Sequence, residues 1–455
     1  MRIEPGSIYS ATLANSLCDV GHASRHVYPS FRVRCRSASA PGPGGSSSRR
    51  LADASPRQRG DTADVTTTTM TLPRPPPPAR AASDEAWLDA ADDIRRRRDV
   101  LVAGLRSGDV RSASQAALAT CALLERVAAA EDWRTAAVLL RRLRRVGGGV
   151  VRAAPGALSV GNVLRRALLV VREEYARNLR ESTSIKDDAG LQRSLGDVLA
   201  ARSAPDALAD RDDRRDVELE ALRDDVLDQL RDLADEIANA REAVAARAPG
   251  LVAPGAVVLT AGRSRSVAAF LRRAAPAEVV VVDEDGRAAA ALAKALPAAA
   301  VTRVTAAAAM AVAGRCRCAV VGCSAALADG GVVAQPGARL VAEACAALRK
   351  PVLALCALYK LAPLHHPGAA AARAAVAADL PLAAALPFGA LPCDAGADPL
   401  AAPAPAVRHP RADAVPPDLV DLLVTNAGVH APSYAPRLLA EMYAPEDHDL
   451  LRAEL

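Results

Sequence analysis

The chain has 455 residues, of which 51% are hydrophobic and only 2% aromatic, so it is long enough for two domains and a tail. Its formal net charge of +5 arises in residues 1–80, where 11 arginines face 5 acidic residues, because the other 46 basic and 47 acidic residues nearly cancel. This balance excludes a bulk electrostatic reason for the folded body to bind nucleic acid directly. No apolar run approaches the roughly 18 residues of a membrane span, so no membrane partner is expected.

Residues 1–81 are rich in Ser, Arg and Pro and contain the low-complexity runs 66–69 and 75–78. Such a segment buries too little apolar surface to offset the entropy lost on ordering, so we predict a disordered tail. Residues 1–50, rich in Arg and Ser and poor in acids, also resemble an organelle transit peptide. We favour a disordered extension of a cytoplasmic protein, with the transit peptide as the alternative.

Residues 82–250 are predicted to form an all-helical domain. Four segments have helical spacing and end at Gly or Pro: near 83–106, 110–129, 132–145 and 157–179. The polar, irregular residues 181–212 are predicted to be a loop.

A long helix is then predicted from about residue 213 to 247, because apolar side chains recur every three or four residues. The apolar positions are Leu219, Leu222, Val226, Leu230, Leu233, Ile237, Ala240 and Val244. We interpret this stripe as the packed face of the domain, although a coiled-coil seam has the same pattern.

From residue 251 the pattern changes to short β-branched runs that alternate with helical segments. The predicted strands are 257–260, 279–282, 301–304, 319–321, 352–355 and 422–425, and the predicted helices lie near 265–275, 286–296 and 338–348. This alternation indicates an α/β fold, with a Rossmann-like domain over 251–455 and a mostly parallel sheet covered on both faces. Residues 365–415, rich in Ala and Pro, are predicted to be a flexible insertion.

A loop with the residue types of an anion site joins the first predicted strand to its helix. It consists of Gly262, Arg263, Ser264, Arg265 and Ser266. Gly permits a tight turn, a helix N-terminus offers free N–H groups, and guanidinium groups bind phosphate. An ordinary strand-to-helix turn uses the same residue types, so the pattern alone does not separate the two.

The nine cysteines lack the regular spacing of a disulfide framework, and most of them lie in apolar runs. We interpret them as small buried hydrophobic residues of a reducing compartment. Cys316, Cys318 and Cys323 are close in sequence, but their spacing fits no zinc pattern and no His lies nearby. Neither a metal nor another cofactor is predicted.

Near the C-terminus, the apolar run 421–425 predicts a buried strand that ends at the polar turn 426–428. Ser433 is expected to cap the following helix, with Pro436 in its first turn, and the helix should end before Pro445. Open α/β sheets place ligand or partner contacts on loops of this kind.

This C-terminal stretch resembles the signature of the beta members of the initiation factor 2B alpha/beta/delta family. That signature is Asn-x-Gly-x-x-Ala-Pro-Ser-Tyr, followed by an Arg-Leu-bearing helix and a Tyr-x-Pro-Glu/Asp-Asp-His tail. The matching residues are Asn426, Gly428, Ala431, Pro432, Ser433, Tyr434, Arg437, Leu438, Tyr443, Pro445, Glu446, Asp447 and His448. Family motifs are also similar to the blocks at 159–175, 262–271, 322–338 and 350–363, with Asp329 in place of the usual Asn.

The resemblance implies a regulatory, non-catalytic beta subunit of the guanine-nucleotide exchange complex for initiation factor 2, which helps to sense phosphorylation of that factor's alpha subunit. It implies as partners the delta, alpha, gamma and epsilon subunits of factor 2B, and factor 2 itself. An alpha or delta subunit remains the alternative, because only the C-terminal blocks separate the three. The candidate partner contacts are Asn162, Arg165, Arg166, Asn426, Tyr434 and Tyr443.

Sugar-phosphate isomerases such as methylthioribose-1-phosphate isomerase resemble the chain over the same blocks and are the enzyme alternative. Their reaction moves a proton between neighbouring carbons and needs a paired acid and base in a closed pocket. The isomerases' catalytic Cys corresponds to Gly262 and their catalytic Asp to Ser324. Neither residue can do that work.

We therefore expect the chain to lack isomerase activity. The purified chain, incubated with methylthioribose 1-phosphate or ribose 1,5-bisphosphate, should give no turnover above background. Turnover that the substitution Cys323→Ala abolished would contradict this assignment, because Cys323 lies one position from Ser324.

Overall fold

The computed structural model describes residues 87–88, 91–186, 219–365 and 410–450. All described residues belong to one compact unit, residues 75–455. The tail predicted over 1–81 and most of the predicted insertion therefore lie outside the described residues.

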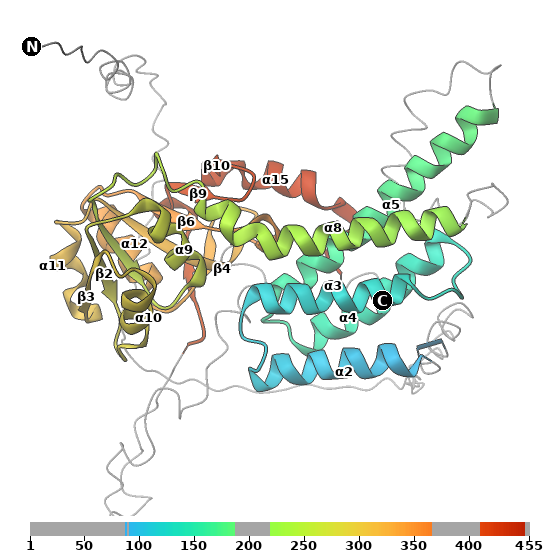
Figure 1. Ribbon diagram of the computed structural model, residues 1–455, viewed down its shortest axis with the longest axis horizontal. Coiled ribbons are helices and arrows are strands. Elements are labelled where there is room, and N and C mark those ends of the chain that lie inside the picture. Colours follow the sequence, from blue (N-terminus) through green and yellow to red (C-terminus); the bar gives the residue numbers. More distant parts are fainter. Residues whose placement is uncertain (1–86, 89–90, 187–218, 366–409, 451–455) are drawn as a thin grey trace, which may run out of the picture. The chain divides into compact units, whose positions relative to one another are not determined.

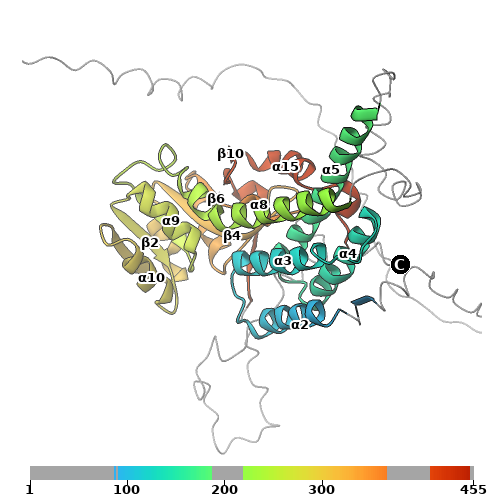
Figure 2. The same cartoon turned by 45° about the vertical axis from the view of Figure 1, so that its right-hand side comes forward.

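Within the described residues, the first domain is built from five helices. They are α2 (Asp92–Ser107), α3 (Ala113–Ala128), α4 (Ala136–Ala153), α5 (Leu158–Lys186) and α8 (Leu219–Ala245). Figure 1 shows α2, α3 and α4 below α8, and the C-terminal end of α8 meets the sheet. Figure 2 shows the same arrangement from a second direction. The predicted loop start at residue 181 is wrong, because α5 continues to Lys186 through residues that lack an apolar stripe.

Side-chain caps fix where two of these helices begin. Ser112 and Gln115 form a capping box at the start of α3, and the Thr135 hydroxyl accepts the N–H of Val138 in the first turn of α4 at 3.2 Å. Between the two helices lies Trp133, which is fully buried and donates its indole N–H to the carbonyl of Ala128 at 2.9 Å. The buried core of the domain therefore includes the turn between α3 and α4.

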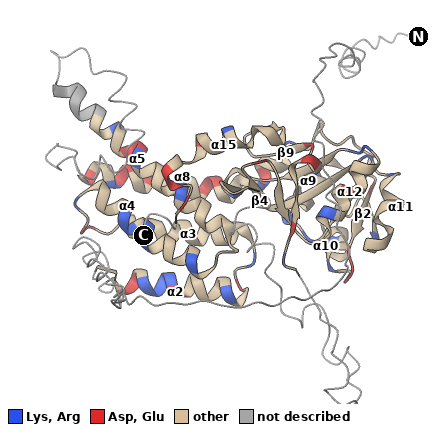
Figure 3. Ribbon diagram, turned by 180° about the vertical axis from the view of Figure 1, so that it is seen from behind, with Lys and Arg blue, Asp and Glu red and all other residues tan. Residues whose placement is uncertain are grey.

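The apolar stripe of α8 packs into this core, which confirms the packed-face interpretation over the coiled-coil seam. Leu222, Val226 and Leu230 are at most 1% exposed, and the stripe continues to Val244. The opposite face carries acidic residues, which Figure 3 shows along α8, whereas α2 and α4 carry mainly basic ones.

The second domain contains a mixed sheet whose main path is parallel except at one edge. Its strands are β1 (Val257–Ala261), β2 (Glu278–Val282), β3 (Ala300–Val304), β4 (Cys318–Leu327), β6 (Val352–Leu355), β9 (Leu422–Val424) and β10 (Val429–His430). Their order is β10-β9-β6-β4-β1-β2-β3, and only β10 pairs antiparallel with its neighbour. Without β10 this is the strand order of a Rossmann fold, so the predicted fold class is confirmed.

Helices cover both faces of the sheet. On one face lie α9 (Arg265–Ala274), α10 (Arg287–Ala295) and the end of α8, and on the other lie α11 (Ala309–Ala313), α12 (Ala338–Ala347) and α15 (Ala435–Met442). Along β1, the side chain of Val258 packs against the face covered by α8, α9 and α10, and that of Leu259 against the face covered by α11, α12 and α15. Burial on both faces explains why the strands read as continuous apolar runs.

Short pieces of structure depart from the sequence predictions. The strands β5 (Val332–Ala334), β7 (Leu361–Ala362) and β8 (Asp413–Val415) extend the sheet beside β4. β8 lies inside the range predicted as a flexible insertion, but it pairs with β5 in an antiparallel register. Strands of two or three residues are too short to produce a periodic signal.

The C-terminal helix α15 starts later than the expected cap. A 3₁₀ turn, Pro432–Tyr434, precedes it, so Ser433 lies within that turn and caps nothing. Pro436 lies in the first turn of α15, as predicted. Among the helices of the described ranges, none combines the length and apolar character needed to cross a membrane.

Candidate functional site

The carboxyl ends of β1 and β4 border a cavity of about 830 Å³. The strand order reverses between these two strands, and open α/β sheets bind ligands at such a switch point. The walls come from the start of α3, the end of α8, the start of α9 and the residues after β6. The helical domain therefore closes a crevice that the sheet alone would leave open.

The predicted anion loop forms one wall of this cavity. Arg263, Ser264, Arg265 and Ser266 line it, and Ser264 caps α9 by accepting the N–H of Val267 at 3.3 Å. α9 therefore begins at the cavity, with the free N–H groups of its first turn beside the lining residues.

Gly262 stands at the start of the loop, where the backbone needs a glycine. Its φ is +64°, a value that L-residues rarely adopt. A Cβ at this position would lie 2.4 Å from Oε1 of Gln335, so the side chain of Gln335 fills the space that a side chain at 262 would occupy. Ser324, on the neighbouring strand β4, donates its hydroxyl to the carbonyl of Val333 at 3.0 Å.

Positive charge dominates the lining of the cavity. The cationic side chains are Arg111, Arg241, Arg263, Arg265, Arg272 and Lys360, and the acidic ones are Asp109 and Glu242. Arg265 bridges the two domains, because one of its guanidinium nitrogens donates to the hydroxyl of Ser112 at 2.6 Å. Such an arrangement suits a small phosphate-bearing anion.

Cys323 and Lys360 line the cavity, and Cys356 is the neighbour of Cys323 on the adjacent strand. Lys360 is 8% exposed and donates to the carbonyl of Cys323 at 2.9 Å. Burial disfavours the Cys323 thiolate, but the Cys356 thiol and the Lys360 ammonium outweigh it and lower the pKa of Cys323. The pKa of Cys356 is raised, first by the neighbouring Cys323 side chain and then by burial.

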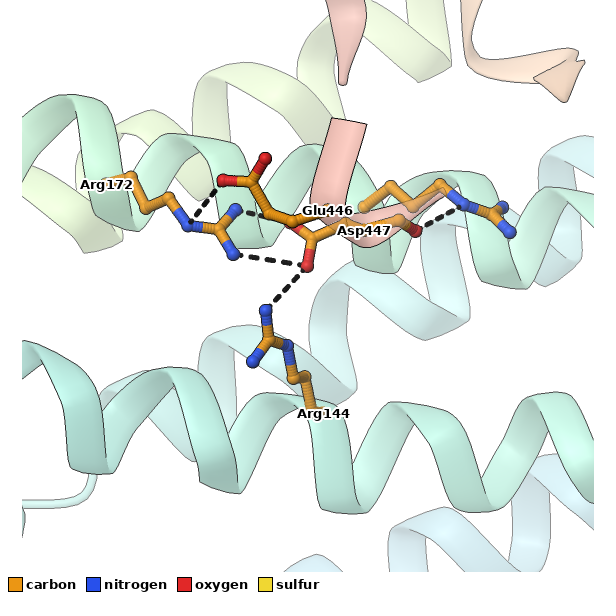
Figure 4. A network of polar contacts seen from close by, with 5 residues as sticks. Arg144, Arg172, Glu446 and Asp447 are labelled. Carbon is orange, nitrogen blue, oxygen red and sulfur yellow. Dashed lines mark hydrogen bonds and ion pairs between the residues drawn. The ribbon is translucent and has the colours of Figure 1, made fainter. Parts of the chain in front are cut away.

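A second polar cluster holds the C-terminal segment against the helical domain (Figure 4). The carboxylate of Asp447 is 1% exposed and accepts bonds from Arg144 at 2.8 Å and from Arg172 at 3.1 Å. A second bond joins Arg172 to the other oxygen of Asp447. Beyond this clamp, Leu450 packs into the core of the helical domain.

Three of the candidate partner contacts belong to this internal junction, so their expected place on a partner surface is wrong. Asn162 and Tyr443 are 1% exposed and Arg165 is 8% exposed. Arg165 donates to the backbone carbonyls of Asp447 and His448, each at 3.0 Å. Asn162 donates to the carbonyl of Tyr359 at 3.2 Å.

Tyr443 packs among the sheet residues and donates its hydroxyl to the carbonyl of Leu361 at 2.8 Å. Burial accordingly raises the pKa of Tyr443. The aromatic ring and the satisfied hydroxyl identify it as a core residue.

The other three candidates keep part of their side chains in solvent. Arg166 lies 3.7 Å from the carboxylate of Glu173 on the same helix. Asn426 ties the sheet to α8, because its amide donates to Glu236 at 2.9 Å and its oxygen accepts the N–H of Leu358 at 2.8 Å.

Tyr434 is the centre of a partly exposed stack. Its ring lies parallel to that of His430, with centroids 5.1 Å apart, and the guanidinium of Arg437 lies 5.5 Å from its centroid. Sequence reasoning named Tyr434 but not the stack. It also missed Arg241 and Gln335, which reach the cavity from segments far from the anion loop in the chain.

The chain matches the model of the Initiation factor 2 subunit family over residues 109–432. This match spans both the helical domain and the sheet. It covers more than half of the chain.

Two curated relatives are similar to the chain over most of their length. Translation initiation factor eIF2B subunit beta of Schizosaccharomyces pombe is 26% identical over 390 residues, 76% of this chain and 95% of the relative. The protein of the same name from Dictyostelium discoideum is 26% identical over 383 residues, 75% of this chain and 94% of the relative.

Solved structures share the fold. The crystal structure of eIF2B beta from Chaetomium thermophilum has a TM-score of 0.57 at 24% identity and covers 80% of this chain and 96% of its own. A tetrameric eIF2B-beta2-delta2 complex from C. thermophilum gives a TM-score of 0.55 at 24% identity, covering 79% of this chain and 99% of its own.

The first prediction from this geometry concerns the clamp. Asp447→Asn should lower the free energy of unfolding by about 3 kcal/mol, because it leaves buried guanidinium groups without their counter-charge. Urea denaturation followed by circular dichroism measures the loss. Glu441→Gln, which breaks an exposed ion pair with Arg437 on α15, is the control and should cost less than about 0.5 kcal/mol. Equal effects of the two substitutions would contradict the role of the clamp.

The second prediction concerns the cavity. Calorimetric titration with inorganic phosphate should show binding, and Arg265→Met should weaken it about tenfold, the effect of losing one charge-assisted hydrogen bond. Arg273→Met is the matched control, because Arg273 is exposed on the same helix and does not line the cavity. The anion assignment fails if phosphate does not bind or if both variants bind it equally well.

Proposed function

Because the chain belongs to the Initiation factor 2 subunit family, we propose that it is the beta subunit of initiation factor 2B, the guanine-nucleotide exchange complex for initiation factor 2. The observation that carries this proposal is the similarity to two beta subunits over 94–95% of their length, which includes both domains. The beta-type C-terminal blocks agree with it, because they hold the clamp residue Asp447 and the exposed Tyr434.

The proposed role is regulatory rather than catalytic. The chain would act with the delta, alpha, gamma and epsilon subunits in the cytoplasm and help to sense phosphorylation of the alpha subunit of initiation factor 2. The cavity supports a non-catalytic role, because Gly262 and Ser324 stand where the related isomerases have a thiol and a carboxylate. Neither glycine nor a serine bonded to a backbone carbonyl supplies the acid and base of an isomerase.

The surface proposed to meet the delta subunit is the stack of His430, Tyr434 and Arg437 at the β10 edge of the sheet. Val429 of the same edge strand is 38% exposed. Aromatic and arginine side chains with a partly exposed apolar neighbour are enriched in the energetically dominant parts of interfaces. A tetramer that contains beta and delta subunits is known from the C. thermophilum proteins, which supports delta as the partner.

The test is co-expression of the chain with the delta subunit of the same organism. The two should co-purify as one complex, and Tyr434→Ala should reduce the recovered delta subunit at least about tenfold, as expected for an interface anchor worth ~2 kcal/mol. Met310→Ala is the control, because Met310 is 51% exposed on α11 and away from the stack. The circular dichroism spectra of both variants should match that of the unchanged chain.

A second readout tests regulation. Exchange complexes reconstituted with and without this chain are compared on initiation factor 2 with and without phosphate on its alpha subunit. Without the chain, phosphorylation should no longer slow nucleotide release. If inhibition persists in full, or if delta fails to bind the unchanged chain, the proposed function is wrong.

A further inference from the structure

Cys323 and Cys356 are neighbours on adjacent parallel strands. The register pairs Gly322 of β4 with Leu355 of β6, and the two cysteines are the next residues along these strands. Both side chains pack into the same core of the sheet. The Cys323 thiol donates to the carbonyl of Leu355 at 2.9 Å, and the Cys356 thiol donates to that of Ala357 at 3.6 Å. Neighbouring strands lie about 4.8 Å apart, within the range of Cα separations that a disulfide can bridge.

This pair differs from other buried cysteines of the described chain. Cys323 is one of the residues that line the cationic cavity, although only 5% of it is exposed. The Lys360 amine donates to the carbonyl of Cys323, which places a positive charge beside both thiols. By contrast, burial raises the pKa of Cys121 to about 12, and no cationic group opposes this effect.

We propose that Cys323 and Cys356 form a redox-active dithiol that hydrogen peroxide converts to a disulfide beside the cavity. The Cys323 sulfur attacks one peroxide oxygen, which gives a sulfenic acid and releases the first water. The Cys356 sulfur then displaces the sulfenic hydroxyl, which leaves as the second water while the S–S bond forms. The two thiols together lose two electrons and two protons, and the peroxide accepts them. This inference does not depend on the proposed function.

The bridge would form beside the junction of the two domains. Cys356 lies two residues before the turn η2 (Leu358–Lys360), and the carbonyl of Tyr359 in this turn accepts a hydrogen bond from the amide of Asn162 on α5. A covalent tie between β4 and β6 would therefore constrain the segment that carries both Lys360 and the contact with the helices.

The test uses the full chain, first reduced and then exposed to hydrogen peroxide. After blocking of the remaining thiols, the protein is digested without reduction and its peptides are sequenced by mass spectrometry. A peptide with Cys323 should be linked to a peptide with Cys356, and dithiothreitol should separate them. Because this map is read on the unchanged chain, it requires no variant to fold.

Three serine variants sharpen the result. Cys323→Ser and Cys356→Ser should each abolish the bridge, whereas Cys121→Ser should form it to the same extent as the unchanged chain. The proposal is overturned if peroxide leaves both thiols reduced or if Cys323 proceeds to sulfinic acid without bridging. A bridge confined to other cysteines, such as Cys316, Cys318 and Cys345, would overturn it as well.

Discussion

The carboxylate of Asp447 lies between α4 and α5, where the guanidinium groups of Arg144 and Arg172 bind it out of contact with water. Such a group of buried charges is stable only as a whole, because removal of one member leaves the others uncompensated. The clamp therefore fixes the path of the chain on either side of it. Tyr443 before it packs into the core of the sheet, and Leu450 after it packs into the core of the helices.

The cavity lies at the junction of the same two domains. A Rossmann sheet has an open crevice where its strand order reverses, and here the start of α3 and the end of α8 close that crevice. Asn162 and Arg265 add polar contacts across this junction. The C-terminal motif contributes to it through Asp447, while the His430–Tyr434 stack remains partly exposed.

Sequence patterns predicted the parts of the fold that are long or buried on both faces. The β-branched runs from Val257 onward gave the strands of the Rossmann order, and the stripe of α8 gave its packed face. Those patterns failed where the signal is local or ambiguous. Ser433 has the residue type of a cap but lies in a 3₁₀ turn, and β8 has only three residues. Tyr443 shows the deeper limit, because an aromatic residue suits a core and an interface equally, and only the fold reveals the carbonyl of Leu361 beside its hydroxyl.

The basic residues of the chain show how composition and position carry different information. Arginine is so abundant in the chain that a single arginine in the cavity carries little information. The site arises because several arginines converge from the segment before α3, from α8, and from the loop and helix of α9. Lysine is rare, yet Lys360 occupies a buried position beside two thiols. A compact ammonium can lie between a backbone carbonyl and two sulfurs, whereas the planar fork of a guanidinium needs a wider arrangement of acceptors. The position of Lys360 is therefore explained by the Cys323 carbonyl and the two thiols around its ammonium group rather than by the arginine-rich composition of the chain.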